Sequence, residues 1–173
     1  MNRFIILLRG INVSGKNKLP MAALRDLLND LKFQQIQTYI QSGNIILNSD
    51  EDKLTVCRKI KEGILSKFGY DVPVLARTLD EWQNAIDTNP YSTESPKIMC
   101  FTFLSELPQE NTFEVQRTND DKFTIIKDVA YLYCPDGFAR TKLTNNLFER
   151  KLKVTATTRN LRTTLKLLEL AKM

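Results

Sequence analysis

Residues 38–47 read TYIQSGNIIL, and this stretch decides the fold because it places Ser42 and Gly43 between two runs that suit β-strands. We expect strands at residues 36–41 and 45–48, joined by a tight turn at the serine and glycine. Strands that are joined directly by so short a turn must be antiparallel. The stretch therefore predicts a hairpin and argues against an all-parallel sheet.

The residues on either side of this hairpin complete one α+β half. Residues 3–8 suit a buried strand, and apolar residues recur at helical spacing within residues 21–31 and again within residues 54–68. Another strand is expected at residues 72–77. The order βαββαβ is that of the ferredoxin-like arrangement, which we predict for residues 1–77.

The remaining residues predict a connecting segment and a second α+β half. Residues 78–96 suit a short helix followed by a turn-rich stretch, and residues 97–173 are expected to form the second half. Its expected elements are a strand at 97–104, a hairpin at 123–134, and helices at 145–152 and at about 158–172. A weaker helical pattern at residues 110–117 would make this half an imperfect repeat of the first. The predicted class is therefore an α+β protein of two halves with mostly antiparallel sheets.

Several residue types that chemistry often requires are absent or sparse. The chain contains no histidine, which excludes Ser–His–Asp and Cys–His catalysis and metal sites built on histidine. The three cysteines, Cys57, Cys100 and Cys134, are scattered without a CxxC pair, so we expect neither a disulfide framework nor a zinc site. The first two suit the core, whereas Cys134 at a strand end is a candidate for exposure. We therefore expect no metal and no other cofactor, and no catalytic residue is indicated.

The apolar stretches of the chain are short. None approaches the length of a membrane-spanning helix, and the run at residues 4–8 is too short for a signal sequence and is followed by Arg9. We therefore expect a cytoplasmic protein without a membrane partner. The sequence does not indicate the oligomeric state.

The positive charge of the chain is concentrated near its C-terminus. The whole chain carries a net charge of +5, and residues 140–173 contain nine Lys and Arg residues against two Glu residues. That segment alone therefore carries +7, whereas the rest of the chain is slightly acidic. Such an excess suits an anionic partner.

The segment that follows the first strand, GINVSGK at residues 10–16, matches the first seven positions of a phosphate-binding P-loop. The next residue of that motif must be Ser or Thr to hold Mg²⁺, and here it is Asn17. The expected antiparallel hairpin also conflicts with the parallel sheet of P-loop proteins. We therefore set the nucleoside triphosphatase reading aside. Two readings stay open: a glycine-containing loop that uses Arg9 and Lys16 to hold an anion, or an ordered loop with solvated lysines.

The predicted topology places this loop beside the hairpin turn. The first strand and the strand after its crossover run parallel, so their C-terminal ends lie at the same edge of the sheet. Arg9 and Asn12 are therefore expected to approach Gln41, Ser42 and Asn44, where amide groups can read both donors and acceptors of a ligand. The alternative that Gln41 and Asn44 only cap the hairpin is equally open.

Apolar and basic residues separate onto two faces of the expected C-terminal helix. The buried face is predicted to carry Leu161, Leu165 and Leu168. The opposite face is predicted to carry Arg159, Arg162 and Lys166. Such a basic face is usually solvated, yet arginines in a first turn oppose the helix dipole and are better explained by a bound anion. Thr155, Thr157, Thr158 and Asn160 are expected to cap the helix, to contact that anion, or to do both. The candidate ligand-binding residues of this half are Arg140, Lys142, Arg159, Asn160 and Thr163.

Four segments together resemble the signature blocks of a bacterial family, the domain of unknown function sixteen ninety-seven. They are LLRGINVSGKNKLP (7–20), TYIQSGNIIL (38–47), RTKLTNNLFER (140–150) and TATTRNLRTTLKLLELA (155–171). The resemblance implies a fold but no activity, because none is established for the family. Three positions depart from the family pattern: Ser14 and Lys32 replace usual glycines, and Leu161 replaces a usual Trp. The last departure removes a surface on which a nucleic-acid base could stack.

Three functional hypotheses follow, in order of preference. The first is binding of a small phosphorylated or otherwise anionic ligand, with a nucleotide among the candidates, at the loop after the first strand and the adjacent hairpin turn. The second is weak, non-specific binding of RNA or single-stranded DNA by the basic C-terminal region. The third is an enzyme that acts on a phosphorylated small molecule without histidine chemistry, using lysine or tyrosine as acid or base.

Overall fold

The computed structural model of the chain describes residues 1–91, 95–116 and 120–173. Contacts within the chain divide it into two units. Unit 1 comprises Met1–Gln83 with Leu167–Met173, and unit 2 comprises Asn84–Lys166. From the sequence, the first half was expected to end at residue 77, and the C-terminus was expected to belong to the second half at residues 97–173. The final residues instead group with unit 1, where the guanidinium of Arg3 donates to the carbonyls of Leu170 and Ala171 at 3.3 and 3.2 Å.

Unit 1 has the element order that the sequence predicts. Its elements are β1 (Asn2–Leu8), α1 (Met21–Asp30), β2 (Gln34–Tyr39), β3 (Asn44–Ser49), α2 (Lys53–Phe68) and β4 (Val74–Thr78). The sheet has the strand order β2-β3-β1-β4, and every neighbouring pair is antiparallel. This βαββαβ arrangement is consistent with a ferredoxin-like unit and excludes an all-parallel sheet.

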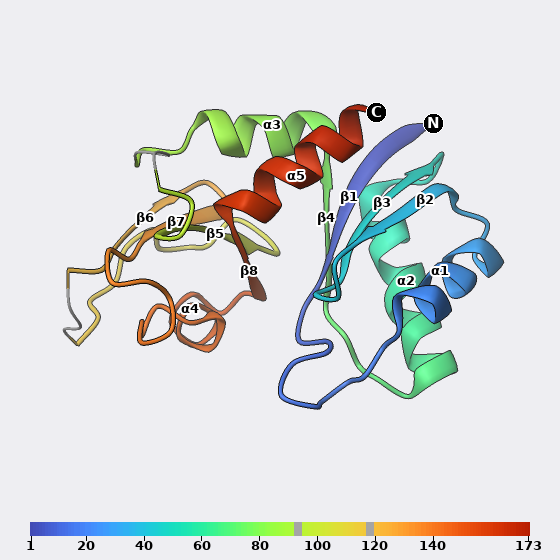
Figure 1. The fold of residues 1–173 in the computed structure, drawn as a ribbon, viewed down its shortest axis with the longest axis horizontal. Helices are drawn as coiled ribbons and strands as arrows, with labels where there is room; N and C mark the ends of the chain where they lie inside the picture. Colours follow the sequence, from blue (N-terminus) through green and yellow to red (C-terminus); the bar gives the residue numbers. More distant parts are fainter. Residues whose placement is uncertain (92–94, 117–119) are drawn as a thin grey trace. The chain divides into compact units, whose positions relative to one another are not determined.

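The core of unit 1 lies between one face of this sheet and its two helices. Phe4, Ile6 and Leu8 of β1 point to this face and pack in one buried cluster with Leu24 of α1 and Ile60 of α2. Figure 1 shows both helices on the same side of the sheet. The alternate residues of β1 are buried as well, which explains why the strand reads as an uninterrupted apolar run.

Unit 2 contains a second antiparallel sheet. Its strands and helix are β5 (Met99–Leu104), β6 (Lys122–Ile126), β7 (Val129–Tyr133), α4 (Asn145–Leu152) and β8 (Ala156–Asn160). The strand order β6-β7-β5-β8 repeats that of unit 1. Two further helices, α3 (Leu79–Asp87) and α5 (Leu161–Lys172), follow β4 and β8 directly. The α+β class with two mostly antiparallel sheets is therefore confirmed.

Two local predictions for the second half are wrong. Residues 110–116 form no helix, while residue 117 lies outside the described residues. The helix expected from about residue 158 begins at Leu161, because the preceding threonine-rich segment forms the edge strand β8. Threonine is β-branched, so it suits a strand as well as a helix cap, and here pairing with β5 selects the strand.

The β4–α3 and β8–α5 connections match in detail. Arg77 and Arg159 are the buried fourth residues of their strands. The next residues then cap the following helix: Thr78 Oγ1 accepts the N–H of Glu81, and Asn160 Oδ1 accepts the N–H of Thr163. This correspondence supports the expectation that the second half is an imperfect repeat, although the described part of unit 2 has no counterpart of α1. No helix in the described residues is both long and apolar enough to cross a membrane.

Candidate functional site

The structure brings the loop after β1 to the hairpin turn between β2 and β3. The amide nitrogen of Asn12 donates to the carbonyl of Gln41 at 2.8 Å and to the carbonyl of Leu19 at 3.0 Å. Its amide oxygen accepts the Leu19 N–H at 2.8 Å. The two segments therefore meet as predicted, but the Asn12 side chain is used to hold backbone groups together.

The turn itself is also held by a side-chain amide. Asn44 is fully buried, and its amide nitrogen donates to the carbonyl of Tyr39 at 3.0 Å and to the hydroxyl of Ser42 at 2.9 Å. These bonds agree with the alternative in which Asn44 caps the hairpin. The side chain of Gln41 is exposed beside this turn.

The loop after β1 is closed by its own hydrogen bonds. Lys16 donates its N–H to the carbonyl of Val13, and the amide of Asn17 donates to the carbonyl of Gly10 at 3.0 Å. The side chain of Lys16 is exposed and that of Arg9 is half-buried. The loop is therefore an ordered structure that presents at least one cation to solvent, whereas the antiparallel sheet behind it is not that of a P-loop protein.

Arg159 does not lie on an exposed helical face, so that prediction is wrong. It belongs to β8, pairs with Phe101 of β5 and is only 7% exposed. Its guanidinium donates to the hydroxyl of Thr157 at 2.8 Å and to the carbonyl of Thr158 at 2.9 Å. Burial lowers the pKa of Arg159 to about 10, which leaves it charged at neutral pH. The guanidinium of Arg159 is therefore bonded within the fold, and the basic face that was predicted for the C-terminal helix loses one of its three cations.

The buried face of α5 also differs from the prediction. Leu161 is buried, but Leu165 is 43% exposed and Leu168 is half-buried. Thr163 and Thr164 are buried in their place. Because the helix starts three residues later than expected, its first turn carries one arginine, Arg162, rather than two.

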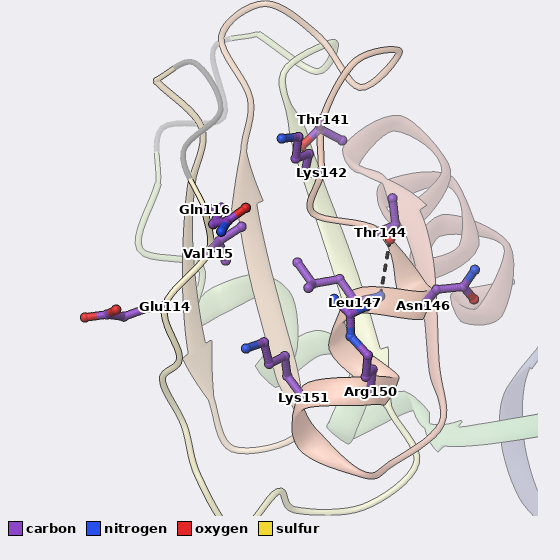
Figure 2. Close-up of a pocket in the computed structure, with 10 residues that line it drawn as sticks. All are labelled: Glu114, Val115, Gln116, Thr141, Lys142, Thr144, Asn146, Leu147, Arg150 and Lys151. Atoms are coloured by element: carbon purple, nitrogen blue, oxygen red, sulfur yellow. Dashed lines mark hydrogen bonds between the residues drawn. The ribbon is translucent and has the colours of Figure 1, made fainter.

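A cavity of about 670 Å³ lies between α4 and residues 114–116, and we call it the cationic cavity. Its lining includes the basic residues Lys142, Arg150 and Lys151. None of these three forms an ion pair within the described part of the chain. Figure 2 shows the side chain of Glu114, the acidic residue of the lining, pointing away from α4.

The N-terminus of α4 contributes to the same cavity. Thr144 caps the helix by accepting the N–H of Leu147 at 3.2 Å, the bond drawn in Figure 2. The first turn of α4 contains no acidic residue, so no carboxylate there neutralises the positive end of the helix dipole. Thr141, Lys142 and Thr144 precede the helix and complete the rim.

Of the predicted residues, only Lys142 lines the cationic cavity. Arg140 is exposed and does not line this cavity, whereas Arg150 and Lys151 line it although the sequence did not single them out. A signal was available, because both belong to the quoted block RTKLTNNLFER. Both residues fall in the last turn of the helix predicted at residues 145–152, where basic residues commonly balance the helix dipole, so that pattern alone does not single them out.

The three cysteines are not poised as nucleophiles. Burial raises the pKa of Cys57 and that of Cys134 to about 11, and it also raises the pKa of Cys100. Cys134 is fully buried and lies 3.6 Å from the hydroxyl of Thr141, so the expected exposure is wrong. Within the described residues, no group of three or more Cys, Asp or Glu residues could hold a metal ion.

Thiol labelling checks this assignment. We expect the native protein to react with a thiol reagent at pH 7 at least about 100-fold more slowly than free cysteine, because raised pKa values leave little thiolate. Complete unfolding in guanidinium should release all three thiols. Rapid labelling of Cys134 in the native protein would contradict both its burial and its raised pKa.

Comparison with known proteins places the chain in a family. The family described as "Protein of unknown function (DUF1697)" matches residues 1–131. The chain belongs to this family. The match includes the motif blocks at residues 7–20 and 38–47, whereas the blocks at 140–150 and 155–171 lie beyond it.

A solved structure extends the comparison over nearly the whole DUF1697 chain. The conserved bacterial protein SP0830 from Streptococcus pneumoniae is similar with a TM-score of 0.77 and 22% sequence identity, covering 98% of both chains. At that identity the likeness supports the fold alone. No curated protein matches the sequence.

Proposed function

We propose that the protein binds a small ligand that carries a phosphate or another anionic group, and that the cationic cavity of unit 2 holds it. The observation that carries this proposal is the gathering of Lys142, Arg150 and Lys151 around one cavity without ion-pair partners in the described residues. Like charges held at one site repel each other, and a bound anion would relieve that repulsion. The cavity volume lies within the range usual for small-molecule sites.

The groups around the cavity are suited to phosphate oxygens. Lysine ammonium and arginine guanidinium groups donate charge-assisted hydrogen bonds, and arginine can donate two in parallel. The dipole of α4 adds about 0.3–1 kcal/mol to the binding of an anion near its first turn. The hydroxyls of Thr141 and Thr144 supply further donors at the rim.

The loop of unit 1 remains a second proposed location for the anion. Arg9, Lys16, Gln41 and Ser42 stay candidates there. The amides of Asn12 and Asn44 bond to the backbone and to the Ser42 hydroxyl, which reduces the polar groups left for a ligand. We therefore rank this location below the cationic cavity.

Replacing basic residues of the cavity with alanine tests the proposal. We expect Lys142→Ala combined with Arg150→Ala to weaken the binding of inorganic phosphate, pyrophosphate, sugar phosphates and nucleotides by about tenfold or more, because each lost contact is charge-assisted. Thermal shift screening followed by titration calorimetry measures this, since a ligand stabilises the folded state that binds it.

A matched control removes the same charge elsewhere in unit 2. Lys97 and Lys122 are exposed and line none of the described cavities, so Lys97→Ala with Lys122→Ala should leave affinity unchanged. The proposal fails if no anion stabilises the wild type more than the Lys142→Ala, Arg150→Ala variant.

Nucleic-acid binding keeps the second rank that the sequence suggested, because two residues that it could use are buried. Phe4, the aromatic residue of β1, is buried in the core of unit 1, and Arg159 is buried in β8. A sheet that recognises RNA by stacking needs exposed aromatics. The exposed Arg162 and the cations of the cavity still provide an electrostatic contribution.

We expect at most weak and sequence-indifferent binding of a labelled single strand. Affinity should fall by about tenfold between about 50 and about 200 mM salt, because roughly three phosphate contacts would be neutralised. Fluorescence anisotropy at the two salt concentrations measures it. Tight, salt-insensitive and sequence-selective binding would reverse the ranking of the two functions.

An enzyme that acts on the same anionic ligand is a third proposal. With no histidine in the chain and with all three thiol pKa values raised, a reaction would use lysine or tyrosine as acid or base. Lys142 and Lys151 are the lysines closest to that role, because they line the cavity.

A further inference from the structure

A second cavity of about 420 Å³ adjoins the cationic cavity, and we call it the mixed cavity. The two cavities share Thr141 and Thr144 in their linings. Both belong to unit 2, and the strands β5, β7 and β8 contribute to the mixed cavity together with residues 138–145. One ligand could therefore occupy both cavities by passing the two threonines.

One part of the mixed cavity is apolar. Cys100, Leu132 and Leu143 are at most 5% exposed, and Phe138 is half-buried beside them. Because burial raises the pKa of Cys100, its thiol is neutral and behaves as a small apolar group. Such a wall suits a flat ring better than a sugar or a second phosphate, both of which would lose hydration there.

The other part of the mixed cavity presents the side-chain amides of Asn145 and Asn160, and both amides are held by hydrogen bonds. Asn160 Oδ1 accepts the backbone N–H of Thr163 at 2.8 Å, and because an N–H can only donate, this bond sets which atom of the amide is oxygen. Asn145 Oδ1 accepts the hydroxyl of Thr158 at 2.6 Å, and that hydroxyl is also paired with Thr102 at 2.7 Å.

These bonds leave the nitrogen ends of both amides as donors. Within the described residues, neither Asn145 Nδ2 nor Asn160 Nδ2 makes a hydrogen bond. Two amide donors beside an apolar wall match the ring nitrogens and carbonyl oxygens at the edge of a nucleobase. A sugar phosphate offers no comparable flat group with acceptors at its edge.

We propose that the ligand of this site is a nucleoside phosphate, with its base in the mixed cavity, read by Asn145 and Asn160, and its phosphate in the cationic cavity. This inference rests on the proposed function and names its ligand class. The base supplies apolar contact and two acceptors, and the phosphate meets Lys142, Arg150 and Lys151. No covalent step is involved.

Binding of four probe classes to the full chain tests the inference. Titration calorimetry would compare the nucleoside monophosphates AMP, GMP, CMP and UMP with the free nucleosides, with ribose 5-phosphate and with inorganic pyrophosphate. We expect at least one nucleoside monophosphate to bind about tenfold or more tightly than ribose 5-phosphate, because base contacts add to the phosphate contacts. Binding of ribose 5-phosphate as tight as that of every nucleotide would overturn the inference.

Two variants then separate the contributions of base and phosphate. Asn160→Ser keeps an oxygen that can cap α5 but removes the amide donor, so it should weaken nucleotide binding by about tenfold and leave ribose 5-phosphate unaffected. Lys142→Ala with Arg150→Ala should weaken both. If Asn160→Ser leaves nucleotide affinity unchanged, the base is not read as proposed.

The proposal of an anion site and the inference that its ligand is a nucleotide would be contradicted by different results. If phosphate-containing probes bind and depend on Lys142 and Arg150 but show no preference for a base, the anion site stands and the nucleotide inference is wrong. If no probe binds at all, the proposed function fails with it. The comparison of probes on the wild-type protein decides the inference even where the Asn160→Ser variant folds poorly.

Discussion

Gly43→Ala is expected to destabilise the protein by about 3 kcal/mol or more, because it combines backbone strain with a steric clash. Gly43 has a φ of +80°, a conformation that side-chain-bearing residues rarely adopt. A Cβ added there would lie 2.6 Å from Leu8 Cβ and 3.0 Å from Ile11 Cδ1. Both neighbours are buried, so neither can move away without disturbing the core.

The clash would act on the junction that organises unit 1. The carbonyl of Gly43 accepts the N–H of Leu8 at 2.8 Å, and this bond joins the hairpin turn to the end of β1. Any shift that relieves the overlap would lengthen this bond and open the place where the loop after β1 meets the turn. The substitution should therefore lower the free energy of unfolding, measured by urea denaturation with circular dichroism.

Gly15→Ala is the matched control for this prediction. Gly15 has a nearly identical φ of +74°, but nothing lies within 4 Å of an added Cβ. The Gly15→Ala substitution should lower the free energy of unfolding by only about 1 kcal/mol, from backbone strain alone. If the two variants lose equal stability, the close packing of the turn against Leu8 and Ile11 is not what restricts position 43 to glycine.

The parts of the fold that the sequence predicts correctly are those set by local chemistry. The antiparallel hairpin around Ser42 and Gly43 and the two helices of unit 1 need no information from distant residues. The same holds for α4, whose bounds at Asn145–Leu152 coincide with the prediction and whose cap, Thr144, directly precedes it.

The parts that were missed depend on contacts between distant segments. β8 is a strand because it pairs with β5, which lies more than fifty residues earlier in the chain, as in the contact between Thr102 and Thr158. Its polar sequence, ATTRN, resembles a capping segment when that partner is not known. Arg159 was therefore placed on a helix surface, whereas pairing with Phe101 carries it into the interior.

The candidate site could be predicted only in part from the sequence, for the same reason. A concentration of positive charge after residue 140 is visible in the sequence, and Lys142 was selected from it. That Arg150 and Lys151 face the same cavity depends on the irregular segment 114–116 lying opposite α4. This segment has no pattern that would predict its path.

Phe148→Ala is expected to destabilise the protein by about 3–5 kcal/mol, the usual cost of removing a large buried ring. Phe148 is fully buried on α4, and its ring lies 5.5 Å from that of Phe113 and 5.4 Å from that of Phe123, both in edge-to-face geometry. These two rings also contact each other at 4.8 Å. The substitution would leave a void in this cluster and remove its aromatic contacts.

The same change should reach the candidate site, because α4 carries Thr144 at its cap and Arg150 and Lys151 on its last turns. A helix that loses its main buried anchor would hold these groups less firmly, so anion affinity should fall together with stability.

Leu165→Ala is the control for this prediction. Leu165 is a helical leucine that is 43% exposed, and replacing it should lower the free energy of unfolding by less than about 1 kcal/mol. Urea unfolding of both variants measures the difference. A loss for Leu165→Ala as large as that for Phe148→Ala would contradict the buried face assigned to α5, and a negligible loss for Phe148→Ala would contradict the aromatic core beneath the cationic cavity.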